Sequence, residues 1–388
     1  MSPHDLNTAV LEYLQLQNID SEILATVASS LGDPPQCALL EKWLVDSKSV
    51  VDISKFMPAT NPTFIMEGHR NRVSAVAIHP KWSIAASGCA DGEIKIWNLE
   101  TGELERTVLA HTRPVLSLAF SPLSNMLVSS SGDLSVKVWD VGKGMANVRT
   151  MRGHEHTVSA VTCAVDSSTN TEYVLSASRD KTIRLWELQT GLFVKSYLGH
   201  LDWVRAIAVA TVQSSPAQEK HTYLLSVSSD RQAILRPIFE TDGSSEEVKT
   251  FRNHKNVIEC CAIAPREAFK TFEGKEGVED SENSIIFATG GRDCHIFVYH
   301  SDSQTPILDL QGHDNWVQAI QFHPNGKHLI SVGDDNNMII WDLATGKIEP
   351  KKKIMNHLVI SLPWRNRFVI TVTMAQRVRL WKTLSNKL

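Results

Sequence analysis

Histidine, serine and aspartate recur together along the chain, and they are the residue types of a nucleophilic triad. Seven histidines, each preceded by Gly, Ala or Asn, stand at intervals of 42 to 59 residues: His69, His111, His154, His200, His254, His313 and His357. A hydroxyl residue follows each of them: Ser87, Ser129, Ser176, Ser226, Thr289, Ser331 and Thr371. A triad needs one geometry at one place, whereas this set is repeated along the chain. We therefore expect these residues to be structural and the protein not to be an enzyme.

Two further markers complete each repeat. An aspartate lies four residues after the hydroxyl in all repeats but the last, which has Ala375: Asp91, Asp133, Asp180, Asp230, Asp293 and Asp335. Six residues later stand Trp97, Trp139, Trp186, Trp341 and Trp381, with Arg236 and Tyr299 in the fourth and fifth repeats. Histidine, hydroxyl, carboxylate and indole N–H can form a buried chain of donors and acceptors. We expect this chain to hold the turn before the aspartate against the next repeat.

The period and the markers resemble the WD-repeat family, in which one repeat forms one four-stranded blade. Seven repeats predict an all-β, seven-bladed WD-repeat β-propeller over residues 62–388. The segment 63–66 is expected to supply the outer strand of the last blade, because joining the two ends removes an open sheet edge. Polar segments at 211–222 and 266–284 are expected between the first and second strands of blades four and five, on the face opposite the aspartate turns. Pro237 and the missing aspartate at Ala375 predict softer fourth and seventh blades.

Composition limits the class of partner. The 388 residues carry a formal charge of −4 with 42% hydrophobic and 21% charged residues, which argues against a general nucleic-acid binder and favours a protein partner. No apolar run approaches the roughly 20 residues that span a bilayer, so we expect no membrane insertion. The six cysteines show no CxxC spacing, so we expect neither disulfides nor a metal site, and we expect a cytoplasmic protein without cofactors.

The first 60 residues lack strand alternation. One helical stripe, predicted to mediate dimerisation, contains Leu6, Val10, Tyr13 and Leu14 and continues with Ile23, Leu24 and Val27. Two short helices cannot bury enough surface alone, so a second copy is the simplest cover, with packing on its own propeller as the alternative. Residues 1–34 resemble the LisH dimerisation motif. Residues 35–61 predict a short helix or coiled-coil remnant and a linker.

Longer strings narrow the resemblance. TMRGHEHTVSAV (150–161), SASRDKTIRLWELQTG (176–191), GHLDWVRAI (199–207) and ALLEKW (38–43) are similar to the lissencephaly-1 family, whose fungal members are the NudF or PAC nuclear-distribution proteins. The resemblance implies a homodimeric regulator of the cytoplasmic dynein heavy chain that also binds a NudE-like coiled-coil protein. It implies action at microtubule plus ends and spindle poles, in nuclear migration, spindle positioning and minus-end-directed transport.

The resemblance also implies a dynein-binding face. Its contact positions fall on Arg179, Arg205, Arg292 and Trp316, and a position that is normally lysine falls on Asn336. Trp203 repeats the Trp316 position one motif earlier. Because these residues lie in turns that enter a blade or precede its aspartate, we expect all of them on one face of the propeller. Arginine and tryptophan are the types enriched at interface hot spots.

Two other functions stay open. A LisH-containing WD-repeat adaptor of a ubiquitin ligase or corepressor would use the same disc for a different partner. A propeller hydrolase would need an unpaired carboxylate or metal cluster at the central channel, and the sequence indicates none.

Overall fold

The computed structural model describes residues 57–58, 63–212, 221–239, 248–274, 284–348, 352–353, 364–365, 368–372 and 377–384. The chain divides into two compact units, one of Met1–Met57 with Ser385–Leu388 and one of Pro58–Leu384. The predicted helical head and its stripe (Leu6, Val10, Tyr13, Leu14, Ile23, Leu24 and Val27) lie outside the described residues. Within the described ranges no helix is long and apolar enough to cross a membrane.

The unit Pro58–Leu384 is built from antiparallel sheets, five of four strands and two of five strands in the described ranges. Blade one holds β3 (Val73–Ile78), β4 (Ile84–Cys89), β5 (Glu93–Asn98) and β6 (Leu104–Leu109). Blade two holds β7 (Val115–Phe120), β8 (Met126–Ser131), β9 (Ser135–Asp140) and β10 (Ala146–Arg152). Blade three holds β11 (Val158–Asp166), β12 (Thr171–Ser178), β13 (Ile183–Glu187) and β14 (Phe193–Tyr197).

The second half of this unit repeats the pattern. Blade four holds β15 (Val204–Val212), β16 (His221–Ser228), β17 (Ala233–Pro237) and β18 (Lys249–Phe251). Blade five holds β19 (Ile258–Ile263), β20 (Ile286–Gly291), β21 (His295–His300) and β22 (Leu308–Gln311). Blade six holds β23 (Val317–Phe322), β24 (His328–Gly333), β25 (Asn337–Asp342) and β26 (Lys347–Ile348), with β27 (Lys352–Lys353) also on β25. Blade seven holds β28 (Trp364–Arg365), β29 (Phe368–Val372) and β30 (Arg377–Leu384), and β1 (Met57–Pro58) and β2 (Phe64–Glu67) both pair with β30.

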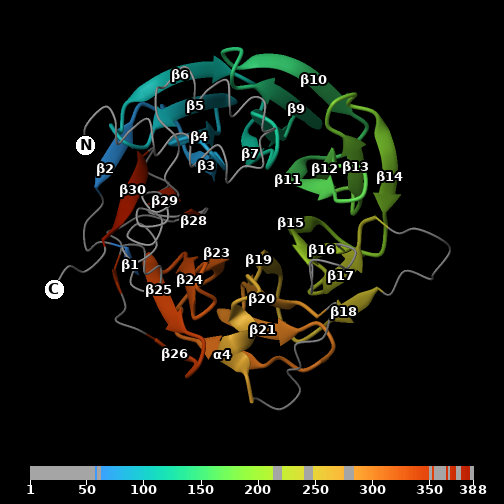
Figure 1. Ribbon diagram of the computed structural model, residues 1–388, viewed down its shortest axis with the longest axis vertical. Helices are drawn as coiled ribbons and strands as arrows, with labels where there is room; N and C mark the ends of the chain where they lie inside the picture. Colours follow the sequence, from blue (N-terminus) through green and yellow to red (C-terminus); the bar gives the residue numbers. More distant parts are fainter. Residues whose placement is uncertain are drawn as a thin grey trace, which may run out of the picture. The chain divides into compact units, whose positions relative to one another are not determined.

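The sheets stand around a common centre (Figure 1). The first strands β3, β7, β11, β15, β19 and β23 lie nearest that centre, and β6, β10 and β14 lie on the rim. First strands of neighbouring blades also contact each other, because Ser74 donates from Oγ to the carbonyl of Val115 and Ser159 donates likewise to Val204. The arrangement confirms the predicted seven-bladed WD-repeat β-propeller.

The hydrophobic core is divided among the blade interfaces. The cluster between blades two and three, for example, packs Val128 and Val138 against Val158 and Val174. Middle strands are covered on both faces by the neighbouring blades, so apolar residues follow one another in them instead of alternating with polar ones. Trp341 is only 1% exposed, and burial of a large apolar side chain contributes about 1.5–3 kcal/mol. Each blade is therefore stabilised mainly by its neighbours.

The ring closes where the ends of the chain meet. β2 pairs antiparallel with β30, with Met66 opposite Val378. Met66 is 1% exposed and packs in one cluster with Trp97 of blade one and Val378. The prediction that residues 63–66 supply the outer strand of blade seven is confirmed.

The two insertions differ in detail from their predictions. The bounds 211–222 are wrong, because the ladder of β15 and β16 continues through Thr211 opposite Thr222; β-branched residues favour such an extension. The second insertion contains an unpredicted helix, α4 (Ala268–Phe272), whose Phe272 is fully buried. Gly326 in blade six permits this packing, since a Cβ there would lie 2.3 Å from the Ala268 nitrogen. The register of β19 with β20 puts this insertion at the strand ends opposite the aspartate turn, as predicted.

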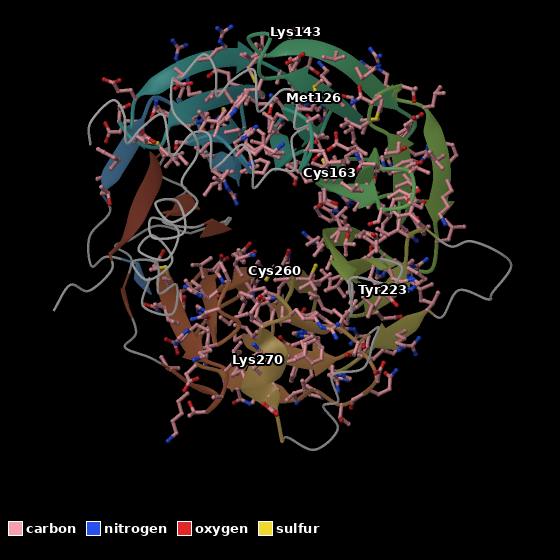
Figure 2. The ribbon with its side chains drawn as sticks, in the orientation of Figure 1. Met126, Lys143, Cys163, Tyr223, Cys260 and Lys270 are labelled. Carbon is pink, nitrogen blue, oxygen red and sulfur yellow. The ribbon has the colours of Figure 1, made fainter. Side chains whose placement is uncertain are left out.

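The described cysteines are free: Cys89, Cys163, Cys260, Cys261 and Cys294. Cys163 and Cys260 lie on the inner strands β11 and β19 (Figure 2). Burial raises the pKa of the Cys163 thiol. These thiols are therefore poor nucleophiles.

Candidate interaction surface

The recurring polar residues form hydrogen-bonded chains inside the blades. In blade six, Trp341 Nε1 donates to Ser331 Oγ at 2.7 Å, and Ser331 Oγ lies 2.7 Å from His313 Nε2. His313 Nδ1 lies 2.9 Å from the Asp335 carboxylate. Since Ser331 accepts from the indole, its own hydrogen points to Nε2, and the Nδ1 hydrogen of His313 is donated to Asp335. Each of the four side chains in this hydrogen-bonded chain thereby has a partner.

The same chain occurs in blades two and three, as His111–Ser129–Asp133–Trp139 and His154–Ser176–Asp180–Trp186. Blades four and five keep the histidine links, as His200–Ser226–Asp230 and His254–Thr289–Asp293. These side-chain links join the aspartate turn to the loop that enters the same blade. The expectation that they reach the next repeat is therefore wrong.

Blade one departs from this pattern. His69 Nε2 lies 2.7 Å from Ser87 Oγ, and Trp97 donates to the same oxygen at 2.7 Å. Asp91, predicted to complete the chain, instead accepts from Asn71 Nδ2 at 2.9 Å. His69 Nδ1 is buried and has no hydrogen-bond partner among the described residues. Burial, with the charge of Lys95, lowers the pKa of His69 to about 4.

Hydrogen bonding dominates the electrostatics of the complete chains. Burial alone would raise the pKa of Asp335, but hydrogen bonds from His313 and Asn337 outweigh it and hold the pKa well below its usual range. His154 and Thr182 have the same effect on Asp180. Both carboxylates are thus ionised at neutral pH and oriented by fixed partners, which makes them structural anchors of their turns.

Backbone hydrogen bonds bring the two kinds of turn together. The residue before each aspartate donates its N–H to the carbonyl of the residue three positions after the histidine. Arg179 thus donates to Thr157, Ser229 to Trp203, and Asp334 to Trp316, at 2.9–3.0 Å. Because every such pair lies at the end of the blade that carries the aspartate turn, the arginine and tryptophan positions share one face of the propeller.

The side chains of this face form one connected group across blades three to six. The Cζ atoms of Arg179 and Arg205 lie 5.2 Å and 3.6 Å from the centre of the Trp203 ring, which is cation–π distance. Arg292 Cζ lies 4.1 Å from the centre of the Trp316 ring. Glu259 joins the two halves, because its carboxylate lies 3.6 Å from Arg205 Nη1 and 2.5 Å from Arg292 Nε. We call this group the arginine–tryptophan cluster: Arg179, Trp203, Arg205, Glu259, Arg292 and Trp316.

Comparison with known proteins agrees with the fold. The family model "WD domain, G-beta repeat" matches residues 60–98, 102–140, 145–187, 245–300 and 304–342. Nuclear distribution protein PAC1 of Fusarium vanettenii is 34% identical over 399 residues, which cover 93% of this chain and 87% of that protein. Nuclear distribution protein nudF of Aspergillus niger is 38% identical over 312 residues, covering 79% of this chain and 67% of that protein. The chain belongs to the PAC1/nudF family of WD-repeat proteins.

Alignment lengths differ within this family. Nuclear distribution protein PAC1 of Arthroderma otae is 38% identical over 303 residues, which are 76% of this chain but 63% of that protein. The chain thus spans slightly less than two thirds of that relative's length.

Glu259 was not predicted from the sequence. It lies five residues after His254, at the position that Arg205 occupies after His200, so the repeat register itself could have identified it. Its side chain is 10% exposed and neutralises part of the charge of two guanidinium groups. In this PAC1/nudF family member, Glu259 therefore fixes the direction in which Arg205 and Arg292 point.

Asn336, where the resemblance implies a lysine, lies directly after Asp335 with a φ of 60°. Its N–H donates to the Gly333 carbonyl at 3.1 Å and closes the turn. Asparagine tolerates this left-handed conformation better than most residues. The equivalent position of blade three holds Lys181 at a φ of 71°, so this turn also accepts lysine, and the backbone does not explain the asparagine.

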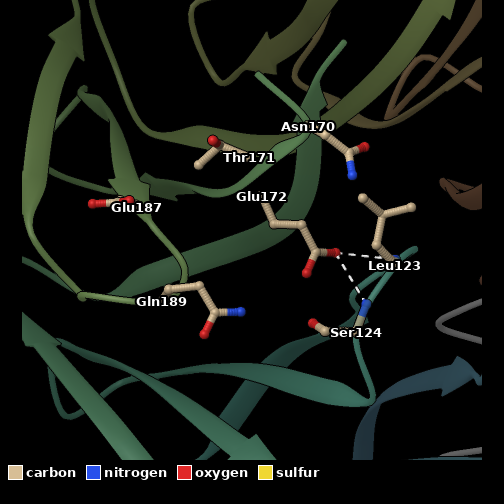
Figure 3. A pocket seen from close by; sticks show the side chains of 7 residues that line it. All are labelled: Leu123, Ser124, Asn170, Thr171, Glu172, Glu187 and Gln189. Atoms are coloured by element: carbon tan, nitrogen blue, oxygen red, sulfur yellow. Dashed lines mark hydrogen bonds between the residues drawn. The ribbon is translucent and has the colours of Figure 1, made fainter. Parts of the chain in front are cut away.

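The other face carries a polar pocket of about 400 Å³ between blades two and three, lined by Leu123, Ser124, Asn170, Thr171, Glu172, Glu187 and Gln189 (Figure 3). Glu172 is 6% exposed, and its carboxylate accepts backbone N–H groups from Leu123 at 3.0 Å and Ser124 at 3.4 Å. It also accepts the Ser121 hydroxyl. All three bonds go to Oε1, and through this oxygen Glu172 of blade three is joined to blade two.

Proposed function

We propose that this protein is a non-enzymatic regulator that binds the motor domain of cytoplasmic dynein through the arginine–tryptophan cluster. Its relatives are named nuclear distribution proteins, which supports a role in nuclear distribution, and its WD-repeat propeller favours a scaffold over an enzyme. In this proposal the protein acts in nuclear migration, spindle positioning and minus-end-directed transport. It does so at microtubule plus ends and spindle poles, together with a NudE-like coiled-coil protein.

The observation that carries the proposal is the cluster itself. Trp316 is 37% exposed, and Arg179 is exposed as well. The three guanidinium groups of the cluster outnumber its single carboxylate, Glu259, and can bind carboxylates of a partner. Asp202 and Asp334 lie near Arg205 and Arg292 and offset part of this positive charge. Stacking on indoles orients the guanidinium groups before binding, which reduces the entropy lost on association.

The test is the double substitution Trp316→Ala with Arg292→Ala, measured as affinity for the purified dynein motor domain. Truncation of a hot-spot anchor costs on the order of 2–4 kcal/mol, so the dissociation constant should rise about 30-fold or more. Because Arg292→Ala also removes the bond to Glu259, the free energy of unfolding should fall by about 1–2 kcal/mol, and the variant should stay folded at the temperature of the binding assay. Lys143→Ala is the matched control, because Lys143 lies in the β9–β10 turn (Figure 2) with its side chain 81% exposed.

An unchanged affinity in the double variant would refute the proposal. Capture experiments with the same pair of variants separate the alternative function. If the protein is a LisH-containing adaptor, the parent chain should capture ubiquitin-ligase or corepressor subunits and no dynein heavy chain. The double variant should then fail to capture those subunits.

We further propose that the protein is a homodimer joined through its N-terminal head. Mass photometry of the full chain should give twice the mass of one chain. A shortened chain that starts near residue 60 should give the mass of a monomer. A full chain that stays monomeric at micromolar concentration would exclude the dimer.

A further inference from the structure

Blade one carries three departures from the other blades at one place. Cys89 stands where Ser131, Ser178 and Ser228 stand in blades two to four. Those hydroxyls accept the N–H of the aspartate and donate to a carbonyl of the entering loop, as Ser178 does to His156 at 3.1 Å. Glu93 occupies the position of Ser135 and Thr182. Asp91 is bonded to Asn71 instead of to His69.

The third departure follows from the second. In blade three the Thr182 hydroxyl donates to Asp180 at 2.7 Å and helps to hold it beside His154. Glu93 has no hydrogen to donate at neutral pH, and its negative charge repels a carboxylate two residues away. Asp91 therefore turns outward to Asn71, and His69 loses the acceptor that every complete chain supplies.

The three groups that remain are of types that can bind a metal ion. One ligand atom each of His69, Cys89 and Glu93 lies within 4.8 Å of the other two. His69 is 5% exposed and Cys89 is fully buried, whereas Glu93 is partly exposed and can move. Imidazole, thiolate and carboxylate are the ligands of Zn²⁺, whose bonds of about 2.0–2.3 Å put neighbouring ligand atoms roughly 3.5 Å apart. The three ligand atoms would have to come closer together by about 1 Å, and Glu93, the most exposed of the three residues, is the best placed to move.

We propose that His69 Nδ1, Cys89 Sγ and the Glu93 carboxylate bind one Zn²⁺ ion, which replaces the missing histidine–aspartate link of blade one. A water molecule would complete four-coordination. The site is structural in this proposal. It ties the loop that enters blade one to the turn between β4 and β5, beside the closure of the ring.

The hydrogen bonds of the blade can accommodate the ion. With the metal on Nδ1, the hydrogen of the neutral His69 ring moves to Nε2 and is donated to Ser87, which already accepts from Trp97. The Ser87 hydroxyl must then donate elsewhere, and the equivalent Ser226 of blade four donates to the carbonyl of Ile234 at 3.3 Å. Lys95 offers the corresponding carbonyl in blade one. The only net proton released on binding comes from the Cys89 thiol, which becomes a thiolate.

Lys95 opposes the ion. Its ammonium group lies 3.7 Å from the Glu93 carboxylate and donates to Thr107 at 2.9 Å. It can keep the bond to Thr107 when Glu93 turns toward a metal. Removal of its charge, by Lys95→Met, should tighten zinc binding on the order of tenfold.

The experiment uses the full chain, stripped of metal by a chelator and titrated with Co²⁺ and Zn²⁺. Co²⁺ should produce a thiolate charge-transfer band, and Zn²⁺ should abolish the band at one equivalent per chain. Zn²⁺ should also raise the thermal unfolding midpoint, whereas Mg²⁺ should not, because it prefers oxygen ligands. Cys89→Ser should remove the band, and Cys294→Ser, a change at a free cysteine of blade five, should retain it.

A second variant keeps the test decisive if one substitution disturbs folding. Cys89→Ser combined with Glu93→Thr restores the residue types of blade three, so it should fold, lose the response to zinc and match the stability of the metal-free parent. The proposal is overturned if the parent shows no thiolate band, or if the band persists in either variant that lacks Cys89.

Discussion

Arg292 donates from Nε to the Glu259 carboxylate at 2.5 Å. Glu259 lies on the inner strand β19, and Arg292 lies in the turn between β20 and β21. The same carboxylate lies 3.6 Å from Arg205 of the preceding blade. One acidic side chain thus sets the positions of two arginines on the proposed binding face.

Glu259→Gln keeps the shape of this side chain and removes its charge. Hydrogen bonds to charged groups are worth about 1.5–3 kcal/mol, and both arginines are partly solvent-screened, so the free energy of unfolding should fall by about 1–2 kcal/mol. Urea denaturation measures this loss. Glu103→Gln, on an exposed residue of blade one, should stay within about 0.5 kcal/mol of the parent. Equal effects of the two substitutions would contradict the bridging role.

Blades six and one offer a matched pair of aspartates. Asp335→Asn breaks the link to His313 and leaves buried polar groups poorly paired, so the free energy of unfolding should fall by about 1.5–3 kcal/mol. Asp91→Asn should cost about 0.5 kcal/mol or less, because Asp91 is exposed and has no link to its histidine. Chemical denaturation of both variants under the same conditions checks the difference. A larger cost at Asp91 would contradict the structure of blade one.

The same aspartates predict a dependence of stability on pH. The pKa of Asp180 and Asp335 is lower in the folded chain than the ordinary value near 4, so the unfolded chain binds more protons between the two values. Their contribution to stability is complete above about pH 4 and is lost as the pH falls toward the folded pKa. Thermal unfolding between pH 3 and pH 7 should therefore change less in Asp335→Asn than in the parent. If the unfolding midpoints of the two proteins changed equally with pH, Asp335 would bind no additional proton on unfolding, and the prediction would be wrong.

Ring closure predicts a contrast between adjacent residues of β2. Met66→Ala removes a side chain that is 1% exposed and leaves a cavity between blades seven and one, at a cost of about 2–5 kcal/mol. Ile65, which is 48% exposed, points away from this core, and Ile65→Ala should cost less than about 1 kcal/mol. Denaturation midpoints of the two variants test the closure. Similar losses would mean that β2 does not seal the ring.

The repeated motif was enough to predict the number of blades, the position of the closing strand and the face that carries the aspartate turns. These features repeat at a fixed register, and a histidine, a hydroxyl and an indole at constant spacing can satisfy one another only inside one type of blade. The arginine and tryptophan positions followed from the same register, because a turn residue keeps its place in every copy of the motif.

The contacts between neighbouring repeats could not be predicted in this way and became visible in the folded chain. The bridge from Glu259 to Arg205 joins side chains of two blades. The helix α4 of blade five packs against Gly326, which lies between β23 and β24 of blade six. No spacing within one repeat encodes either contact, since each depends on distant residues that folding brings together. Asp91 shows the same limit within a blade: its spacing fits the motif, but the charge of Glu93 and the amide of Asn71 decide where its carboxylate points.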